Sequence, residues 1–213
     1  ATAVACTTIE VAEKALGLRS KRRYPHMNPI SLTAPLRRED IAQLRAGDSV
    51  LLSGTIYTAR DAAHGRLCAA LDAGEALPVD LHEQTIFYAG PTPPPPGKPT
   101  GAIGPTTSVR MDAYTPKLLR YGVNALIGKG DRTQPVRAAI EENEAVYFAA
   151  IGGCAAYMAA CVKRCDVVAY EDLGTESIKR LEIENMPLTV AVDCHGGNAY
   201  QDGMAAYRAS LEA

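Results

Sequence analysis

Residues 49–70, SVLLSGTIYTARDAAHGRLCAA, decide the fold that the sequence predicts. Residues 49–52 form a short apolar run, which is typical of a buried strand. A helix is expected from about residue 59 to residue 70, ending near Gly74, because glycine commonly follows the last helical turn. Strand-like and helix-like stretches go on alternating toward the C-terminus. This order predicts an α/β protein with a largely parallel sheet.

The other expected elements continue this alternation. Strands are expected at residues 85–88, 125–127, 145–151, 166–170, 178–183 and 188–192. Helices are expected at residues 104–111, 136–142, 154–164 and 204–211. Pro116 should break or restart the first of these helices, because proline lacks the N–H that a helix interior needs. The proline-rich residues 91–99 should form an extended surface loop.

Length and charge narrow the possible functions. The 213 residues suit one domain with an appended arm, and we expect the arm at residues 1–32 and the domain at residues 33–213. A net charge of −2 gives no general bias toward nucleic acid or membrane. No apolar run approaches the roughly 20 residues of a membrane span, and no secretory pattern opens the chain. We therefore expect a cytoplasmic protein with no nucleic-acid or membrane partner.

Neither the cysteines nor the first 26 residues identify a function. Its six cysteines include no C-x-x-C pair, and a chain of this length can build a core without disulfides, so reduced thiols are expected. The first 26 residues have basic and amphipathic character. They fit an arm, a partner contact or an extension upstream of Met27, and the sequence does not choose among these.

The first of three polar clusters at strand-to-helix junctions contains Arg60, Asp61 and His64. Helical spacing predicts that Arg60 and Asp61 each lie beside His64. The guanidinium of Arg60 could then bind a carboxylate through two parallel hydrogen bonds. From the spacing alone, a surface Arg–Asp pair with a histidine on the same face is the favoured alternative.

The second and third clusters also suit anions. Thr106 and Thr107 follow Gly104-Pro105 at an expected helix start, where hydroxyls and free N–H groups can hold an anion or simply cap the helix. Arg110 lies one helical turn after Thr106 and can face the same pocket. Lys129 stands between two glycines directly after a strand, which fits a ligand-binding turn or a solvated lysine.

Together the clusters offer three cations and several hydroxyls, a set that suits a small dicarboxylate. The chain lacks a cluster-binding cysteine set, H-E-x-x-H, G-x-S-x-G and a Rossmann fingerprint. It therefore has anion-binding groups without an obvious electrophile, and we expect it to bind no metal itself.

The motifs resemble a known family. The segments are Ser53-Gly54-Thr55-Ile56, Arg60-Asp61-x-x-His64, Gly104-Pro105-Thr106-Thr107-x-x-Arg110-Met111-Asp112, Gly128-Lys129-Gly130, Ile151-Gly152-Gly153 and Leu173-Gly174-Thr175-Glu176 with Ile178. They resemble the C-terminal domain of class I fumarases and the β subunits of two-subunit fumarases and L-tartrate dehydratases. The likeness covers roughly residues 33–198, with Cys154 standing where single-chain fumarases usually have proline.

The resemblance implies a swivelling β/β/α domain that works with a separate α subunit. That subunit would carry a [4Fe–4S] cluster, and the active site would form between the two chains, with β–β contact in a hetero-oligomer. By motif, Arg60, Thr107, Arg110 and Lys129 would bind the substrate. Thr106 would transfer the proton, with Asp61 and His64 as alternative catalytic residues or as residues that orient Arg60.

These implications favour the reversible hydration of fumarate to L-malate, a step of the tricarboxylic acid cycle. The first alternative is dehydration of L-tartrate by the same mechanism. From another class comes a non-catalytic module that binds or senses anions, and a third alternative is a structural partner that only covers the cluster subunit.

Overall fold

The structure is a computed structural model that describes residues 29–212, so the alternatives for residues 1–26 lie outside the described residues. The strands are β1 (Ile30–Ala34), β2 (Ser49–Thr58), β3 (Thr85–Phe87), β4 (Ala125–Gly128), β5 (Val146–Ala149), β6 (Val162–Ala169) and β7 (Ile178–Val192). The helices are α2 (Arg38–Gln43), α3 (Asp61–Asp72), α4 (Thr115–Tyr121), α5 (Gln134–Glu142), α6 (Ala155–Cys161) and α7 (Ala199–Glu212). Two 3-10 helices, η1 (Ser108–Met111) and η2 (Glu171–Glu176), complete the list, and the predicted α/β class is confirmed.

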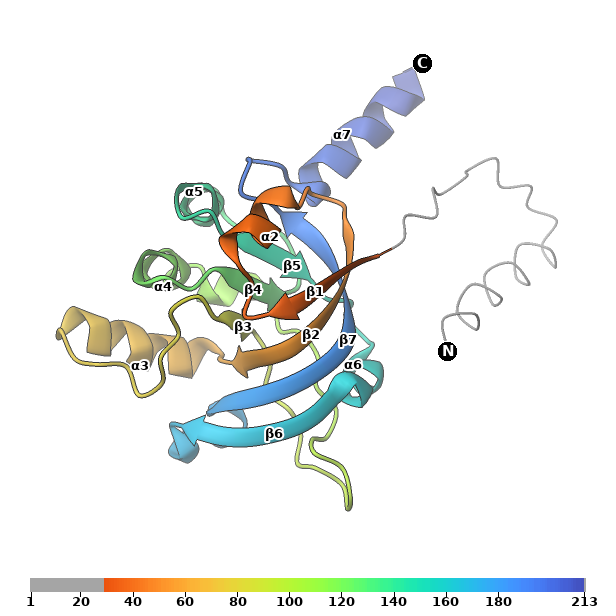
Figure 1. The fold of residues 1–213 in the computed structure, drawn as a ribbon. Coiled ribbons are helices and arrows are strands. Elements are labelled where there is room, and N and C mark those ends of the chain that lie inside the picture. The colour runs from red at the N-terminus through yellow and green to blue at the C-terminus, as the bar shows by residue number, and fades with distance from the viewer. Residues whose placement is uncertain (1–28, 213) are drawn as a thin grey trace, which may run out of the picture.

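The sheet closes on itself. Strands β1 to β5 pair in parallel, each with the next, whereas β7 runs antiparallel to β2, β5 and β6. Because β7 pairs with both β5 and β2, the strands β2, β3, β4, β5 and β7 form a closed ring. Strands β1 and β6 extend from this ring (Figure 1). The largely parallel sheet is confirmed, and its closure by β7 is a feature that the order of elements did not predict.

Alternate residues of the ring strands enter two separate cores. Ile56, Phe87, Ile127, Phe148 and Val190 are among those that fill the inside of the ring. Ile86, Tyr88, Leu126 and Tyr147 point outward, where they pack against Leu67, Leu118 and Ile140 of the helices α3, α4 and α5. These three helices form one layer beside the sheet (Figure 1). The two-residue period of the strands thus builds a core on each face of the sheet.

Four predicted elements were wrong in extent or type. The strands expected at residues 178–183 and 188–192 are one strand, β7, which continues through Asn185 in the left-handed region at φ 50°. The helix expected at 154–164 ends at Cys161, and the chain then enters β6. Residues 104–107 are not helical, because Thr107 pairs with Lys129 beside β4, and only η1 follows.

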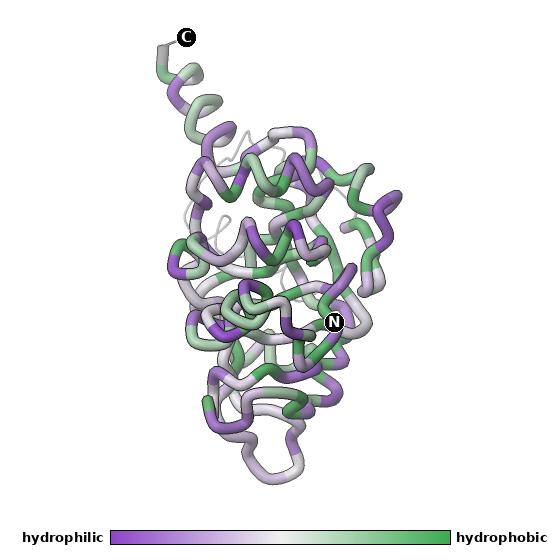
Figure 2. Tube along the Cα trace, turned by 90° about the vertical axis from the view of Figure 1, so that its left-hand side faces the viewer, coloured by the Kyte–Doolittle hydropathy of each residue, from purple (hydrophilic) through white to green (hydrophobic). Residues whose placement is uncertain are grey.

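Two elements near the start of the described chain were not predicted. They are strand β1, which begins at Ile30, and helix α2. Helix α7 starts earlier than expected and extends away from the body in both views (Figures 1 and 2). Within residues 29–212, every helix is too short or too polar to cross a membrane.

Candidate functional site

The three polar clusters lie at one edge of the ring, where the carboxyl ends of neighbouring parallel strands meet. Arg60 follows β2, and Lys129 follows β4. The N–H of Thr106 donates to the carbonyl of Tyr88, directly after β3, over 2.7 Å. Such edges are the usual ligand-binding positions of parallel α/β sheets.

Arg60 is held from two sides at the start of α3. Its Nη2 lies 3.2 Å from Oε1 of Glu176, and its Nε lies 3.8 Å from Oδ1 of Asp61. The other oxygen of Glu176 accepts the N–H of Ala62 over 3.2 Å, so this carboxylate also caps the helix. A Cβ at Gly90 would come within 3.2 Å of Cδ of Arg60, so glycine there leaves room for the arginine.

Thr106, Arg110 and Asp61 are also brought together. Arg110 donates a hydrogen bond through Nη2 to the hydroxyl oxygen of Thr106. Its Nη1 lies 3.9 Å from Oδ2 of Asp61, so this aspartate stands between Arg60 and Arg110. A cation that donates to a hydroxyl oxygen favours the deprotonated hydroxyl.

Lys129 runs beside the same segment. Thr107 and Lys129 form an isolated parallel bridge, and the N–H of Ser108 donates to the Lys129 carbonyl over 3.0 Å. In return the N–H of Lys129 donates to Oγ of Ser108, also over 3.0 Å. A Cβ on Gly152 would touch Cδ of Lys129 at 3.8 Å, so the lysine stem passes this glycine.

His64 does not share the surface of Arg60 and Asp61. The imidazole is fully buried, Nδ1 lies 2.8 Å from the Arg60 carbonyl oxygen, and the ring stands edge-on to Tyr88 at 5.2 Å. Burial lowers the pKa of His64 to about 4, although the hydrogen bond to the Arg60 carbonyl works in the opposite direction. The ring is therefore neutral at pH 7, and its hydrogen bond is to the backbone of Arg60 rather than to the guanidinium.

Sequence reasoning missed a buried cation beneath the site. The Arg132 guanidinium is wholly buried, with Nε 2.8 Å from Oδ1 of Asp112 and Nη2 2.9 Å from the hydroxyl of Thr115. It also lies 5.3 Å and 4.9 Å from the ring centres of Tyr88 and Tyr147. Burial raises the pKa of Tyr147, whose hydroxyl donates to the Gly130 carbonyl over 2.8 Å. This cluster supports the turn that carries Lys129.

The only sequence signal for this cluster was indirect. Asp112 ends one recognised motif and Arg132 follows another, but their spacing says nothing about contact. The same holds for Glu176, which stands in a recognised segment far along the chain from Arg60.

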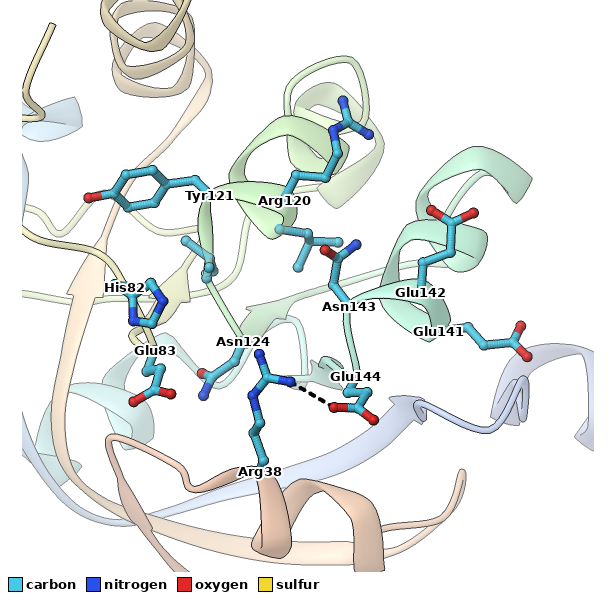
Figure 3. Close-up of a pocket in the computed structure, with 13 residues that line it drawn as sticks. Arg38, His82, Glu83, Arg120, Tyr121, Asn124, Glu141, Glu142, Asn143 and Glu144 are labelled. Atoms are coloured by element: carbon cyan, nitrogen blue, oxygen red, sulfur yellow. Dashed lines mark hydrogen bonds and ion pairs between the residues drawn. The ribbon is translucent and has the colours of Figure 1, made fainter. Parts of the chain in front are cut away.

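A hollow lies at the opposite, amino ends of β3, β4 and β5 (Figure 3). It is lined by both charge signs, and Arg38 pairs there with Glu144 over 2.8 Å. The lining residues labelled in Figure 3 are Arg38, His82, Glu83, Arg120, Tyr121, Asn124, Glu141, Glu142, Asn143 and Glu144. None of the residues predicted for the site is among them.

The structure is an α/β domain in which Arg60, Thr106, Arg110 and Lys129 lie at one edge of the ring, here called the rim. Within residues 29–212, no group of three or more His, Cys, Asp or Glu side chains could hold a metal ion. The family model described as "Fumarase C-terminus" matches residues 6–203. The match includes most of the segment that sequence analysis had placed outside the resemblance.

Individual relatives agree with this match. The chain is 40% identical over 173 residues to the putative L(+)-tartrate dehydratase subunit beta of Methanocaldococcus jannaschii, covering 78% of this chain and 89% of the relative. It is 36% identical over 176 residues to the anaerobic class I fumarate hydratase of Escherichia coli, covering 81% of this chain but 32% of the relative. Fumarate hydratase 2 of Leishmania major is 33% identical over 188 residues, covering 84% of this chain and 33% of the relative.

The chain belongs to the fumarase C-terminus family. It spans about a third of the length of the fumarate hydratases that it matches, and nearly the whole length of the archaeal β subunit.

Proposed function

We propose that the chain is the β subunit of an iron–sulfur hydro-lyase that hydrates fumarate reversibly to L-malate, and that it acts with a cluster-bearing α subunit. One observation carries the proposal: Arg60, Thr106 and Arg110 meet at a single edge of the ring, with Lys129 on the neighbouring strand end. Arginine side chains bind carboxylates through paired hydrogen bonds. A dicarboxylate has one such group at each end.

In this proposal the residues of the chain have separate roles in substrate binding, proton transfer and orientation of the arginines. Arg60, Arg110 and Lys129 bind the substrate carboxylates, and the hydroxyl of Thr107, beside Lys129, adds a donor. Thr106 transfers the proton, because the Arg110 guanidinium stabilises its deprotonated oxygen. Asp61 and His64 orient the arginines, since Asp61 stands between them and the neutral imidazole bonds the Arg60 backbone.

The electrophile is assigned to the partner. A [4Fe–4S] cluster held by the α subunit would supply a Lewis acid for the hydroxyl group that is added or lost. Apolar side chains at the rim favour a covering partner: Val109 beside Arg110 is 50% exposed, and Ile151 is 67% exposed. We infer that the domain swivels relative to the α subunit and that two β subunits touch in the hetero-oligomer. The free cysteines of the described chain favour a cytoplasmic location.

Dehydration of L-tartrate is the second candidate. It is favoured by the 40% identity to a putative tartrate dehydratase β subunit that the chain nearly spans. The rim offers the same cations to both acids, so turnover must separate the two.

The test is anaerobic turnover of fumarate, L-malate and L-tartrate by the chain alone and after mixing with a cluster-bearing α subunit. Activity only in the mixture supports the shared site, and the preferred acid decides between the two candidates. Activity of the chain alone would contradict the assignment of the electrophile. A mixture that forms a complex but converts none of the three acids would favour a non-catalytic anion-binding module.

A further inference from the structure

A buried lysine stands behind the substrate-binding arginine. Lys179, near the start of β7, is 8% exposed. Its ammonium donates to Oγ of Ser177 at 2.6 Å and to the Gly174 carbonyl at 2.9 Å, with the Thr175 and Ser177 carbonyls at 3.3 and 3.4 Å. All four acceptors are neutral. Within residues 29–212, no carboxylate is in ion-pair contact with this ammonium.

Burial of such a charge is unfavourable, and here it lowers the pKa of Lys179. The free-energy cost of burying the ammonium is offset only if the neutral acceptors stay in place around it. They come from both sides of one residue, since Gly174 and Thr175 precede Glu176 and Ser177 follows it. The lysine is thus the centre of the turn that presents Glu176.

The turn also has other bonds: the N–H of Ser177 donates to the Gly174 carbonyl over 3.2 Å, and the hydroxyl of Thr58 donates to the Ser177 carbonyl over 3.5 Å. Gly174 has φ 59° inside η2, and its carbonyl also accepts the hydroxyl of Ser177 at 2.7 Å. Within η2, Asp172 pairs with Arg66 and ties the segment to α3, but this pair lies before Gly174 and is half exposed. The ammonium of Lys179 adds bonds to Gly174, Thr175 and Ser177, on both sides of Glu176.

Glu176 in turn determines where Arg60 lies. One of its oxygens contacts the guanidinium and the other caps the helix that Arg60 precedes. We propose that Lys179 is a positioning residue: through the 174–177 turn and Glu176, it holds the Arg60 guanidinium in the orientation that receives a substrate carboxylate. This inference rests on the proposed function for its substrate, and on the observed contacts for everything else.

The kinetic test compares Lys179→Met, Glu176→Gln and the double variant in the complex with the α subunit. Lys163→Met, at an exposed lysine on β6, is the matched control. A misplaced Arg60 weakens binding of ground state and transition state alike, so we expect KM to rise about tenfold with kcat within about threefold. Because Lys179 acts through Glu176, the double variant should be no worse than the worse single variant. Effects that multiply, or a loss confined to kcat, would overturn the proposal.

A measurement without turnover separates this proposal from the proposed function. Amide hydrogen exchange at residues 174–177 of the full chain should accelerate about tenfold or more in Lys179→Met, and remain unchanged in Lys163→Met. If Lys179→Met does not fold, Ser177→Ala removes the shortest contact of the ammonium and should show the same effect more weakly. Unchanged exchange and an unmoved Arg60–Glu176 pair in a crystal structure of the variant would refute the positioning role. An inactive wild-type complex would refute only the function.

Discussion

At the scale of single residues, the rim contains cations that the protein neutralises only in part. Asp61 is shared between Arg60 and Arg110 at 3.8 and 3.9 Å, which is too far for strong hydrogen bonds. Within residues 29–212, Lys129 makes no ion pair. Positive charge thus remains available for an anion at this edge.

Arg110→Ala should lower kcat/KM of the complex by about 10²-fold, on the order of 3 kcal/mol, because a desolvated charge pair with the substrate is lost. The matched control is Arg120→Ala, at an exposed arginine of α4 that lines the opposite hollow. Steady-state kinetics on both variants would measure the difference. An effect at Arg110 smaller than about threefold would contradict its carboxylate-binding role.

Thr106→Ala should chiefly lower kcat if its hydroxyl transfers the proton, since substrate binding by the cations is retained. Thr106→Ser keeps the hydroxyl and should keep most of the rate. Comparison of kcat and KM for the two variants checks this. A rise in KM alone would assign Thr106 to binding.

His64 predicts a pH dependence of stability. Its folded pKa of about 4 lies below the ordinary value of 6.5, so the unfolded state binds more protons between these pH values. The stabilisation is complete above about pH 6.5 and is lost as the pH falls toward 4, by about 3 kcal/mol in total. In His64→Gln the urea-unfolding free energy should fall less steeply over this window, whereas the exposed His82→Gln should change the slope little. Equal slopes in wild type and His64→Gln would show that the imidazole is not held neutral.

At the scale of elements, the turn after β4 depends on close packing against η1. A Cβ at Gly128 would lie 2.0 Å from Oγ of Ser108 and 2.9 Å from a ring carbon of Tyr88. Ser108 cannot move freely, because its hydroxyl also bonds the hydroxyl of Tyr147 at 2.9 Å. The element that carries Lys129 is therefore fixed by a glycine.

Gly128→Ala should destabilise the chain by about 1–3 kcal/mol through overpacking and should reduce activity of the complex by displacing Lys129. Gly65→Ala is the matched control, because Gly65 lies inside α3 and its added methyl would meet Tyr114 at an ordinary 3.7 Å. There the gain in helix propensity should stabilise by up to about 1 kcal/mol. Thermal unfolding of the two variants should shift in opposite directions, and a neutral Gly128→Ala would contradict the close-packing argument.

The sequence predicted most element types but not how far several extend. The apolar run at residues 49–52 was visible, yet β2 continues to Thr58, because its half-buried Thr55 and Tyr57 pair with β7. The bulge at Asn185 resembles a break between two strands when only the amino-acid sequence is considered. Residues 104–107 had the composition of a helix start, and their pairing with β4 is a tertiary effect.

The site shows the same limit. Arg60, Arg110 and Lys129 were predicted because motifs carry them, whereas the contact of Glu176 with Arg60 joins distant parts of the chain. Periodicity and spacing report only on near neighbours along the sequence, so this contact needed the fold. Lys179 contacts near neighbours, but no quoted motif carries it and its burial depends on the fold.

At the scale of the whole molecule, α7 is the element that stands apart. Its side chains from Gln201 to Leu211 are exposed, and Met204, Tyr207 and Leu211 recur on one face of the helix. In Figure 2, hydrophilic and hydrophobic colours alternate along it. Its start is anchored, since Nδ2 of Asn198 donates to Asp131 at 3.0 Å and the hydroxyl of Tyr200 accepts the N–H of Gly130 at 3.2 Å.

Deletion of residues 204–213 should change the unfolding free energy by no more than about 0.5 kcal/mol, because the described side chains removed make few contacts with the body. The same deletion should weaken β–β association, which sedimentation of wild type and the deletion variant would measure. A control with Met204→Ala, Tyr207→Ala and Leu211→Ala keeps the helix and removes its apolar face. A large loss of thermal stability would show instead that α7 packs on the body.

The closed ring also determines where the molecule can polymerise. Among residues 29–212, only β1 and β6 have an unpaired side, since every other strand is paired on both. Along β6, the charged Lys163, Arg164 and Asp166 oppose the addition of a foreign strand. Strand β1, ISLTA, carries no charge, and no described strand pairs with its free side. We therefore expect an intermolecular sheet to form along this side when the protein is concentrated or heated.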